Sequence, residues 1–442
     1  MKLKQTPINQ QVVKQVIDHC GIPVVGKATI RELVKIVNQI ESLSGQKFIR
    51  MEMGIPGIAP PQIGVDAEIE ALRNGVASQY ANIEGIPILK EETSRFIKNF
   101  MNLDIPAEYC IPTIGSMQAS IAAIAVGNRA DKQKNKTLFI DPGFPVHKLQ
   151  VKALGLEYEA FDVYEHRGEK LKDILESYLS KGDIATILYS NPNNPSWICF
   201  NEQELSIIGE MANKYEVIIL EDLAYFAMDF RKDYSVPGMP PFQPSIARYT
   251  DQYILLLSSS KSFSYAGQRI GCMAISPKIF HRKFTNLFHY FRNEEFGHAL
   301  IYGCLYSFSA GVSHSAQYGL AAMFKASNDG VFDFVSNLKE YMQRAKAMKE
   351  LFVKYGFHIV YDKDLDENIG DGFYFTFARN GFSGSQLTET LLYYGISAIS
   401  LEITGSLRSE GLRACVSLTD FSQFPLLEER LKAFNQDYAK IV

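Results

Sequence analysis

Short apolar runs alternate with helix-length amphipathic segments through the middle of the chain. Strand-like runs stand at residues 109–114, 136–140, 185–190, 217–220, 253–257 and 269–276, and helical patterns stand near residue 118 and at residues 145–154 and 201–215. Continuous apolar runs are typical of parallel strands buried on both faces, and their alternation with helices indicates β-α-β units. The pattern therefore predicts an α/β fold, a three-layer αβα domain with a mostly parallel mixed sheet.

The two ends of the chain have a different pattern. The first 50 residues carry two amphipathic helical patterns, and the clearer one spans residues 30–43 and is closed by Gly45. Strand patterns return at residues 372–377 and 412–418, with helical patterns between and after them, which predicts a smaller α+β domain. We expect an N-terminal segment that packs with the small domain, a large domain and a C-terminal small domain, at residues 1–60, 61–325 and 326–442.

Polar and glycine-containing segments follow the predicted strands at five places. These segments begin at Gly115, Asp141, Asn191, Glu221 and Ser258. Taken singly, each has an ordinary structural explanation as a turn, a helix cap or an exposed lysine. In parallel α/β sheets, however, ligands bind beyond the carboxyl ends of the strands. Five such segments at successive strand ends therefore indicate a ligand site at one edge of the sheet.

Charge and composition narrow the kind of ligand. The chain has 45 Lys+Arg against 49 Asp+Glu, a formal charge of −4, so no overall basic character draws it to nucleic acid or to a membrane surface. The N-terminus is too polar for a signal peptide, and no apolar run approaches the roughly 20 residues of a membrane span. The six cysteines form no CxxC pair. We expect reduced thiols, a cytoplasmic protein and no metal site.

The segment from Ser258 to Gly271 places a lysine and an arginine directly after a strand. Its pattern, S-x-S-K-x-F-x-x-A-G-x-R-x-G, resembles the cofactor-lysine motif of the fold-type I pyridoxal phosphate (PLP) enzymes, in particular the class I/II aminotransferases. The NPNNP run at residues 191–195 resembles the asparagine motif of that family, and the D-x-A-Y run at 222–225 resembles its pyridine-nitrogen motif. The resemblance, which extends from about residue 50 to the end, implies a homodimeric PLP-dependent transaminase that moves an α-amino group between an amino acid and a 2-oxo acid.

The resemblance gives individual residues roles around the cofactor ring. It implies that Lys261 forms a Schiff base with the cofactor aldehyde and later moves a proton. Asp222 is expected to pair with the pyridine nitrogen, so that the ring accepts electrons. Asn194 and Tyr225 are expected to donate hydrogen bonds to the phenolic oxygen. Phe144 corresponds to the aromatic residue that stacks on the ring, where Tyr or Trp is commoner.

The resemblance also implies a set of phosphate ligands, which are Gly115, Ser116, Met117, Ser258 and Arg269. The first three lie at the start of a predicted helix, where backbone N–H groups and the helix dipole favour an anion. Tyr80 resembles the tyrosine that this family sends across a dimer interface to the phosphate of the neighbouring subunit.

Further residues are assigned to the substrate. Arg413 aligns with the arginine that binds the substrate α-carboxylate, a role in which a forked guanidinium is better than lysine; a surface salt bridge is the rival explanation. Asn194 is expected to contribute to the same site, and Gly54 is a candidate for lining it with backbone. His147 either orients Asp222 or is an ordinary partly buried histidine. Tyr374, Arg292 and Tyr265 are possible linings of a side-chain pocket that no spacing argument supports.

Three other functions share part of this sequence pattern. Ser258-x-x-Lys261 fits the SxxK motif of serine acyl-transferring hydrolases, but the accompanying K-T/S-G triplet is missing from the sequence. A different reaction on the same cofactor, such as β-elimination or carbon–sulfur bond cleavage, is hardly distinguishable by motifs. A transcription regulator with an aminotransferase-like domain would need a basic DNA-reading module, for which 50 residues of mixed charge are too few.

Overall fold

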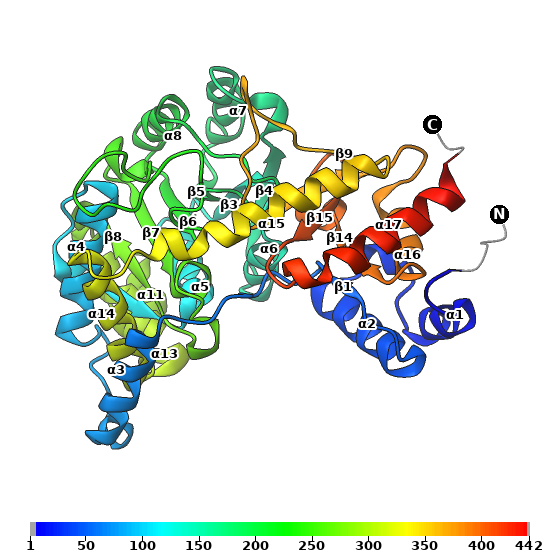
Figure 1. The fold of residues 1–442 in the computed structure, drawn as a ribbon. Helices are drawn as coiled ribbons and strands as arrows, with labels where there is room; N and C mark the ends of the chain where they lie inside the picture. The colour runs from blue at the N-terminus through cyan, green and yellow to red at the C-terminus, as the bar shows by residue number, and fades with distance from the viewer. Residues whose placement is uncertain (1–5, 440–442) are drawn as a thin grey trace. The chain divides into compact units, whose positions relative to one another are not determined.

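The structure is a computed structural model that describes residues 6–439 (Figure 1). The described chain divides into two compact units. The large unit comprises residues 58–193 and 199–338, and the small unit comprises residues up to 57, residues 194–198 and residues from 339 onward. Both ends of the described chain and one short internal segment therefore belong to the small unit.

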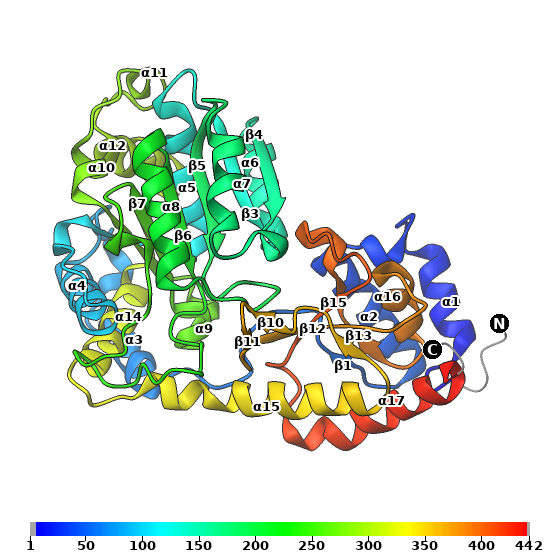
Figure 2. The same ribbon diagram turned by 90° about the horizontal axis from the view of Figure 1, so that it is seen from above.

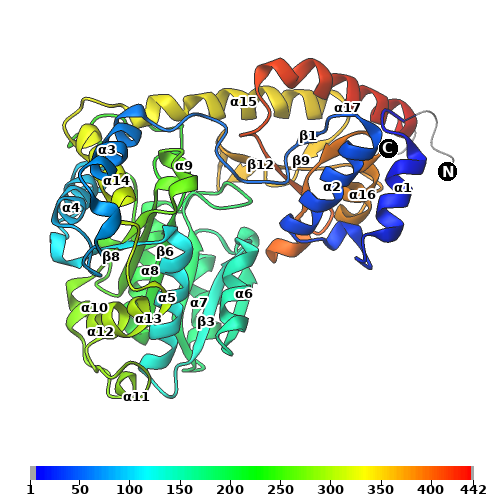
Figure 3. The ribbon, with the colours of Figure 1, turned by 90° about the horizontal axis from the view of Figure 1, so that it is seen from below.

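The large unit contains a seven-stranded sheet in the order β2-β8-β7-β6-β5-β3-β4 (Figures 2 and 3). Its strands are β2 (Cys110–Thr113), β3 (Lys136–Asp141), β4 (Glu157–Asp162), β5 (Ile184–Ser190), β6 (Ile218–Leu223), β7 (Tyr253–Ser258) and β8 (Gly271–Ile275). Only β8 runs antiparallel to its neighbours β2 and β7. The other six strands are parallel, so their carboxyl ends lie along the same side of the sheet. The predicted mostly parallel mixed sheet is confirmed.

Strand β4 was not among the predicted strands, for a physical reason. It lies at the edge of the sheet and pairs with β3 alone. An edge strand exposes one row of backbone groups and part of its side chains, so it has no continuous apolar run. Its sequence EYEAFD places the charged Glu157 and Glu159 in partly or fully exposed positions.

Helices surround the sheet of the large unit. They are α3 (Gln62–Arg73), α4 (Pro87–Met101), α5 (Gly115–Ala130), α6 (Pro145–Ala153), α7 (Lys170–Leu179), α8 (Glu202–Tyr215), α9 (Ser259–Ser262), α10 (Pro277–His281), α11 (Leu287–Phe291), α12 (Phe296–His298), the π-helix η7 (Ala299–Leu305), α13 (Tyr306–Ser309) and α14 (His314–Asn328). Helices α7 and α8 pack together on one face of the sheet, whereas α5 packs against several strands from the other face (Figure 2).

Helix α5 is held close to the sheet by small and polar residues. A Cβ at Gly127 would lie 2.6 Å from the Thr186 methyl group, so glycine permits the close approach. Asn128 donates a hydrogen bond to Thr137 on β3 and accepts one from Thr186 on β5, each at 2.8 Å. Because buried polar side chains need partners, these bonds fix where the helix lies along the sheet. They also fix its N-terminus, which begins at Gly115.

The small unit is built around a four-stranded antiparallel sheet in the order β14-β15-β12-β9. Its strands are β9 (His358–Ile359), β12 (Tyr374–Ala378), β14 (Ile399–Ser400) and β15 (Leu412–Cys415); the shorter pairs are β1 (Ile49–Arg50) with β13 (Ile396–Ser397) and β10 (Lys363–Asp364) with β11 (Glu367–Asn368). Its helices are α1 (Gln10–His19), α2 (Ile30–Ser44), α16 (Gly384–Leu392), α17 (Phe424–Tyr438) and most of α15 (Phe334–Lys354).

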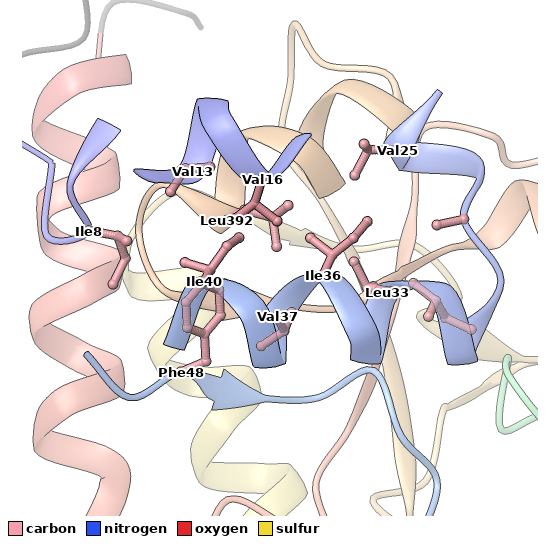
Figure 4. Close-up of a cluster of buried hydrophobic side chains, with 12 residues drawn as sticks. Ile8, Val13, Val16, Val25, Leu33, Ile36, Val37, Ile40, Phe48 and Leu392 are labelled. Atoms are coloured by element: carbon pink, nitrogen blue, oxygen red, sulfur yellow. The ribbon is translucent and has the colours of Figure 1, made fainter. Parts of the chain in front are cut away.

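The N-terminal helices bury their apolar faces within the small unit (Figure 4). Residues of α1 and α2 pack with Leu392 and Ile399 in one buried cluster. Helix α2 has the ends that its sequence predicts, because Thr29 and Glu32 form a capping box and Gly45 ends the helix at φ 68°.

Candidate active site

Lys261 lies on a short, tightly anchored turn in the large unit. Strand β7 ends at Ser258, whose side chain caps α9 by accepting a hydrogen bond from the backbone N–H of Ser260. Ser259 donates to the carbonyl of Ile270 at 2.6 Å, and Ser262 donates to that of Phe226 at 3.1 Å. The small hydroxylated residues around the lysine therefore fix the backbone that carries it.

Asp222 lies near the end of the neighbouring strand β6 and is buried. Burial raises the pKa of its carboxyl group to about 7, although the backbone N–H of Ala224 and the charge of Lys261 act in the opposite direction. In the described structure the Oδ1 atom is buried and accepts no hydrogen bond. A buried carboxylate oxygen that lacks a partner is costly, so this atom fits a bound cationic or N–H group.

His147 lies beside this carboxylate, and Phe144 packs against His147. The Nε2 atom of His147 is 4.0 Å from Oδ2 of Asp222, and the rings of His147 and Phe144 meet edge to face at 5.5 Å. Burial lowers the pKa of His147 to about 4, so the imidazole is uncharged near neutral pH and the contact with Asp222 is not an ion pair. Tyr225 is buried in the turn that follows β6.

Arg269 and the start of α5 form a positively polarised corner. Gly115, at φ 65°, lies so close to Arg269 that an added Cβ would be 2.8 Å from the guanidinium Nη2 atom. In the described structure no side chain caps the N-terminus of α5. The first-turn backbone N–H groups of Gly115, Ser116 and Met117 therefore receive no capping hydrogen bond from a side chain at the N-cap position. An uncapped helix N-terminus beside an arginine suits a phosphate group.

The strand register places Ser258 at the same edge. Gly271 of β8 pairs with Thr113 of β2 on one side and with Ser258 of β7 on the other. Ser258 and the start of α5 therefore lie at one level of the sheet, separated by a single strand. Tyr80 lies apart from the strand ends, in the connection before α4, and is 93% exposed.

Arg413 lies on β15 in the small unit and is fully buried. Its Nη2 atom donates to the carbonyl of Glu52 at 2.6 Å, and its Nη1 atom donates to Oδ1 of Asn194 at 3.3 Å. The guanidinium lies over the ring of Tyr374, with its central carbon 4.5 Å from the ring centroid. Asn194 and Arg413, which are 219 residues apart, are thus brought together.

The charge of Arg413 has no counter-charge of its own. In the part of the chain that the structure describes, no carboxylate pairs with Arg413, and its Nε atom is buried without a hydrogen-bond partner. The carboxylate of Glu52, in contrast, is bound by Arg50 and Ser397. A buried unpaired guanidinium is costly, so it fits an incoming carboxylate. The geometry contradicts the rival expectation of a surface salt bridge.

Gly54 is close to Tyr374. A Cβ at Gly54 would lie 1.9 Å from the Tyr374 hydroxyl oxygen, so the glycine is needed because the phenol fills that space. The Tyr374 side chain therefore lies between Gly54 and Arg413, whose guanidinium covers its ring. Of the other suggested pocket residues, Tyr265 is buried and donates its hydroxyl hydrogen bond to Glu68, and Arg292 ends α11 at φ 57°.

The sequence did not single out Glu52 or Trp197. Glu52 acts on Arg413 through its backbone carbonyl, which no side-chain pattern encodes. Trp197, the single tryptophan of the chain, follows the NPNNP run closely and contacts Tyr374. Its rarity and its place beside that motif were the available signal.

Residues 6–439 offer neither a metal cluster nor a membrane-spanning helix. Among residues 6–439, no group of three or more His, Cys, Asp or Glu side chains is arranged to hold a metal ion. Within the same residues, every helix is too short or too polar to span a bilayer.

Comparison with known proteins identifies the family of this chain. The profile of the family described as aminotransferase class I and II matches residues 47–420. The probable aspartate aminotransferase of Methanocaldococcus jannaschii is 26% identical over 304 residues, which are 69% of this chain and 74% of that protein. The LL-diaminopimelate aminotransferase of Natranaerobius thermophilus is 27% identical over 252 residues, 56% of this chain and 62% of that protein.

Solved structures share the fold. The aspartate aminotransferase of Thermotoga maritima superposes with a TM-score of 0.74 at 18% identity, over 96% of this chain and 99% of that one. Substrate-bound BacF of Bacillus subtilis gives a TM-score of 0.75 at 19% identity, over 92% and 95% of the two chains.

The family match and the shared fold identify a fold-type I enzyme. The chain belongs to the aminotransferase class I and II family, whose members depend on PLP. It is an aminotransferase, which confirms the predicted family, fold, enzyme class and general function.

Proposed function

We propose that this aminotransferase binds PLP at the strand ends of the large unit and exchanges an α-amino group between an amino acid and a 2-oxo acid. The observation that carries the proposal is the buried carboxylate of Asp222, which has an oxygen without a partner and lies within electrostatic range of Lys261. When bound, PLP supplies an aldehyde that takes up amino groups and a ring that accepts electrons. The work of the protein is to hold that group and to move protons.

Asp222 suits the pyridine nitrogen. An anionic carboxylate beside a protonated nitrogen forms a charge-assisted hydrogen bond, which is stronger than a neutral one. A cation at Oδ1 lowers the pKa of Asp222 from its raised value near 7 and keeps the carboxylate ionised at neutral pH. Tyr225 is assigned to the phenolic oxygen, and Phe144 to the face of the ring.

The phosphate is assigned to the corner described above. Arg269 supplies a permanent positive charge, Ser258 supplies a hydroxyl, and the first turn of α5 from Gly115 to Met117 supplies backbone N–H groups. Lys261 is carried by a turn whose backbone is fixed at Ser259 and Ser262. Its Nζ atom is assigned to accept the proton that leaves the substrate α-carbon.

The substrate α-carboxylate is assigned to Arg413 of the small unit. Asn194 and the Glu52 carbonyl hold two of its nitrogen atoms in place, and no carboxylate of the described chain neutralises it. Asn194 also keeps its proposed hydrogen bond to the phenolic oxygen of the cofactor. Gly54 leaves room for the Tyr374 side chain at this place.

Assembly and location are part of the proposal. The exposed Tyr80 supports a homodimer in which this tyrosine reaches the phosphate of the neighbouring subunit. The scattered free thiols support a cytoplasmic location.

The test uses the purified 442-residue chain. Addition of PLP is expected to give a protein-bound visible absorption, and a panel of amino donors with a few 2-oxo acids is expected to reveal turnover that depends on the oxo acid. Asp222→Ala is expected to keep bound cofactor and to lose about 10²- to 10³-fold in kcat, because the electron-accepting ring loses its charge partner. Asp251→Ala, an exposed control, is expected to behave as wild type. Near-normal turnover by Asp222→Ala would contradict the proposed role.

A further inference from the structure

Trp197 adopts an unusual backbone conformation in the small unit. It has φ 66°, in the left-handed region that bulky side chains rarely occupy, and its side chain is 1% exposed. A strained residue of this kind persists only where the surrounding structure holds it, and such residues gather at functional sites. The contacts of the indole ring therefore indicate what this strained residue supports.

The indole ring of Trp197 supports the ring of Tyr374. The two rings meet edge to face, with centroids 6.1 Å apart at 69°. The indole ring also fills the space beside Gly372 that a side chain would need. A Cβ at Gly372 would lie 2.1 to 2.3 Å from indole atoms. The ring of Tyr374 is therefore held from one side by Trp197.

Tyr374 in turn supports Arg413. The guanidinium carbon lies 4.5 Å from the ring centroid, within the range of a cation–π interaction. The Tyr374 hydroxyl fills the space that Gly54 leaves. Gly54 and Gly372 both have φ outside the positive range, so glycine is required at these positions for space alone.

These contacts form a continuous stack from Trp197 through Tyr374 to Arg413. The hydrogen bonds from Arg413 to Glu52 and Asn194 hold two nitrogen atoms, and the aromatic face limits rotation of the guanidinium plane. A fixed plane matters because a carboxylate is best bound by a guanidinium through two parallel hydrogen bonds.

We propose that Trp197 and Tyr374 are positioning residues that orient Arg413 for the α-carboxylate of both the amino acid and the oxo acid. The inference rests on the proposed function and adds to it the two aromatic residues that set the affinity of Arg413 for a carboxylate. If the rings served only as core packing, their loss would lower stability and kcat without a selective effect on KM.

The first test compares Tyr374→Leu with Tyr374→Phe. Leucine removes the aromatic face, and KM is expected to rise about tenfold for the amino acid and for the oxo acid, as expected for the loss of a desolvated cation–π contact. The kcat and the affinity for PLP are expected to stay within about twofold, because neither depends on the plane of Arg413. Phenylalanine keeps the ring and is expected to retain the wild-type KM values.

The second test uses the contact between Gly54 and the Tyr374 hydroxyl. Gly54→Ala is expected to displace the phenol and to raise both KM values. Combining it with Tyr374→Phe removes the hydroxyl oxygen at 1.9 Å and leaves the ring carbon at 3.0 Å as the nearest atom, so most of the affinity is expected to return. If the alanine methyl group instead obstructs the substrate directly, the double variant stays as weak as Gly54→Ala.

The outcomes separate this inference from the proposed function. An active wild-type enzyme with unchanged KM values in Tyr374→Leu, or with no rescue in the double variant, overturns the positioning role alone. A wild-type chain that neither binds PLP nor turns over any amino donor overturns the proposed function itself. The melting temperature of every variant identifies a loss of folding. If Tyr374→Leu does not fold, the rescue of Gly54→Ala by Tyr374→Phe decides whether the positioning role holds.

Discussion

The two arginines that are assigned to ligands, one in each unit, differ in how they are held. Arg269 of the large unit is exposed, and its one side-chain hydrogen bond in the described chain is to the carbonyl of Ala266 at 2.9 Å. Arg413 of the small unit is fully buried and is held by a carbonyl, an amide and an aromatic ring. Arg269 is proposed to bind its ligand together with a helix N-terminus and a hydroxyl, whereas Arg413 is the one charged group that is assigned to its proposed ligand.

This difference follows from the proposed ligands. A phosphate has several oxygen atoms and is well bound by many weak donors at once. A carboxylate has two oxygen atoms and is best bound by one planar, pre-oriented fork. We therefore expect loss of Arg413 to be far more costly than loss of Arg269, and each loss to affect a different ligand.

Both arginines are proposed to bind ligands of a reaction that takes place at the strand ends. The largest expected effect therefore comes from Lys261, which is proposed to carry out that reaction. Lys261→Ala is expected to abolish the visible absorption of bound PLP and to lower kcat by about 10²- to 10⁴-fold, because the general acid–base group is lost. Absorption spectra and steady-state turnover measure both. Lys278→Ala, an exposed lysine of the same unit, is the matched control. An unchanged spectrum in Lys261→Ala would refute the site assignment.

The buried arginine is expected to have the next largest effect. Arg413→Ala is expected to raise KM roughly a hundredfold for amino and oxo acids, because a desolvated charge pair with the carboxylate is lost. The affinity for PLP, measured by equilibrium titration, is expected to remain near that of wild type. Arg31→Ala, on an exposed position of α2, serves as control. A loss of PLP affinity with unchanged KM would reverse the assignment of the two arginines.

The exposed arginine is expected to have a smaller and salt-dependent effect. Arg269→Ala is expected to weaken PLP binding by roughly tenfold at low ionic strength, and by less in high salt, because an exposed charge is screened. The remaining phosphate donors, Ser258 and the start of α5, are unchanged in this variant. Titration at two salt concentrations measures the effect, and an equal loss at both would show that the charge acts as if it were buried.

The smallest expected effect concerns stability of the cofactor-free protein. Burial raises the pKa of Asp222 from 3.8 to about 7, so between these pH values the folded state binds more protons than the unfolded state. Its contribution to the free energy of unfolding therefore falls as pH rises from about 4 to about 7. Asp222→Asn removes this penalty and is expected to raise the melting temperature by a few degrees at pH 8 and hardly at pH 4.

A pH series of melting curves without PLP measures this effect. The opposite shift of His147, whose pKa burial lowers from 6.5 to about 4, arises from the burial of its own ring, which both proteins share. A stabilisation of Asp222→Asn that is equal at both pH values would show that the burial of charge is not its cause.

The strand-end half of the site was predictable because local patterns encode it. Asp222 lies near the end of an apolar strand, Ser258 ends the next strand, and Lys261 follows it. Parallel strands bring their carboxyl ends to one edge of the sheet without further information. Edge strand β4 was missed because its charged residues interrupt the apolar pattern.

The arginine half of the site was less readable for the opposite reason. Arg413 and Asn194 were identified by family resemblance, but the stack beneath them joins Gly54, Trp197 and Tyr374, which are far apart in the chain. Nothing in the NPNNP run indicates that Asn193 belongs to the large unit and Asn194 to the small one. Such a division depends on long-range packing, which short patterns do not record.

Because Trp197 is the only tryptophan in the chain, the molecule carries a built-in optical reporter that one aromatic ring separates from the arginine proposed to bind the substrate carboxylate. Its fluorescence emission can be excited selectively over tyrosine, without a label. Titrating the protein with plain carboxylic acids while following that emission would therefore measure binding of a carboxylate at Arg413 directly, before any catalysis takes place.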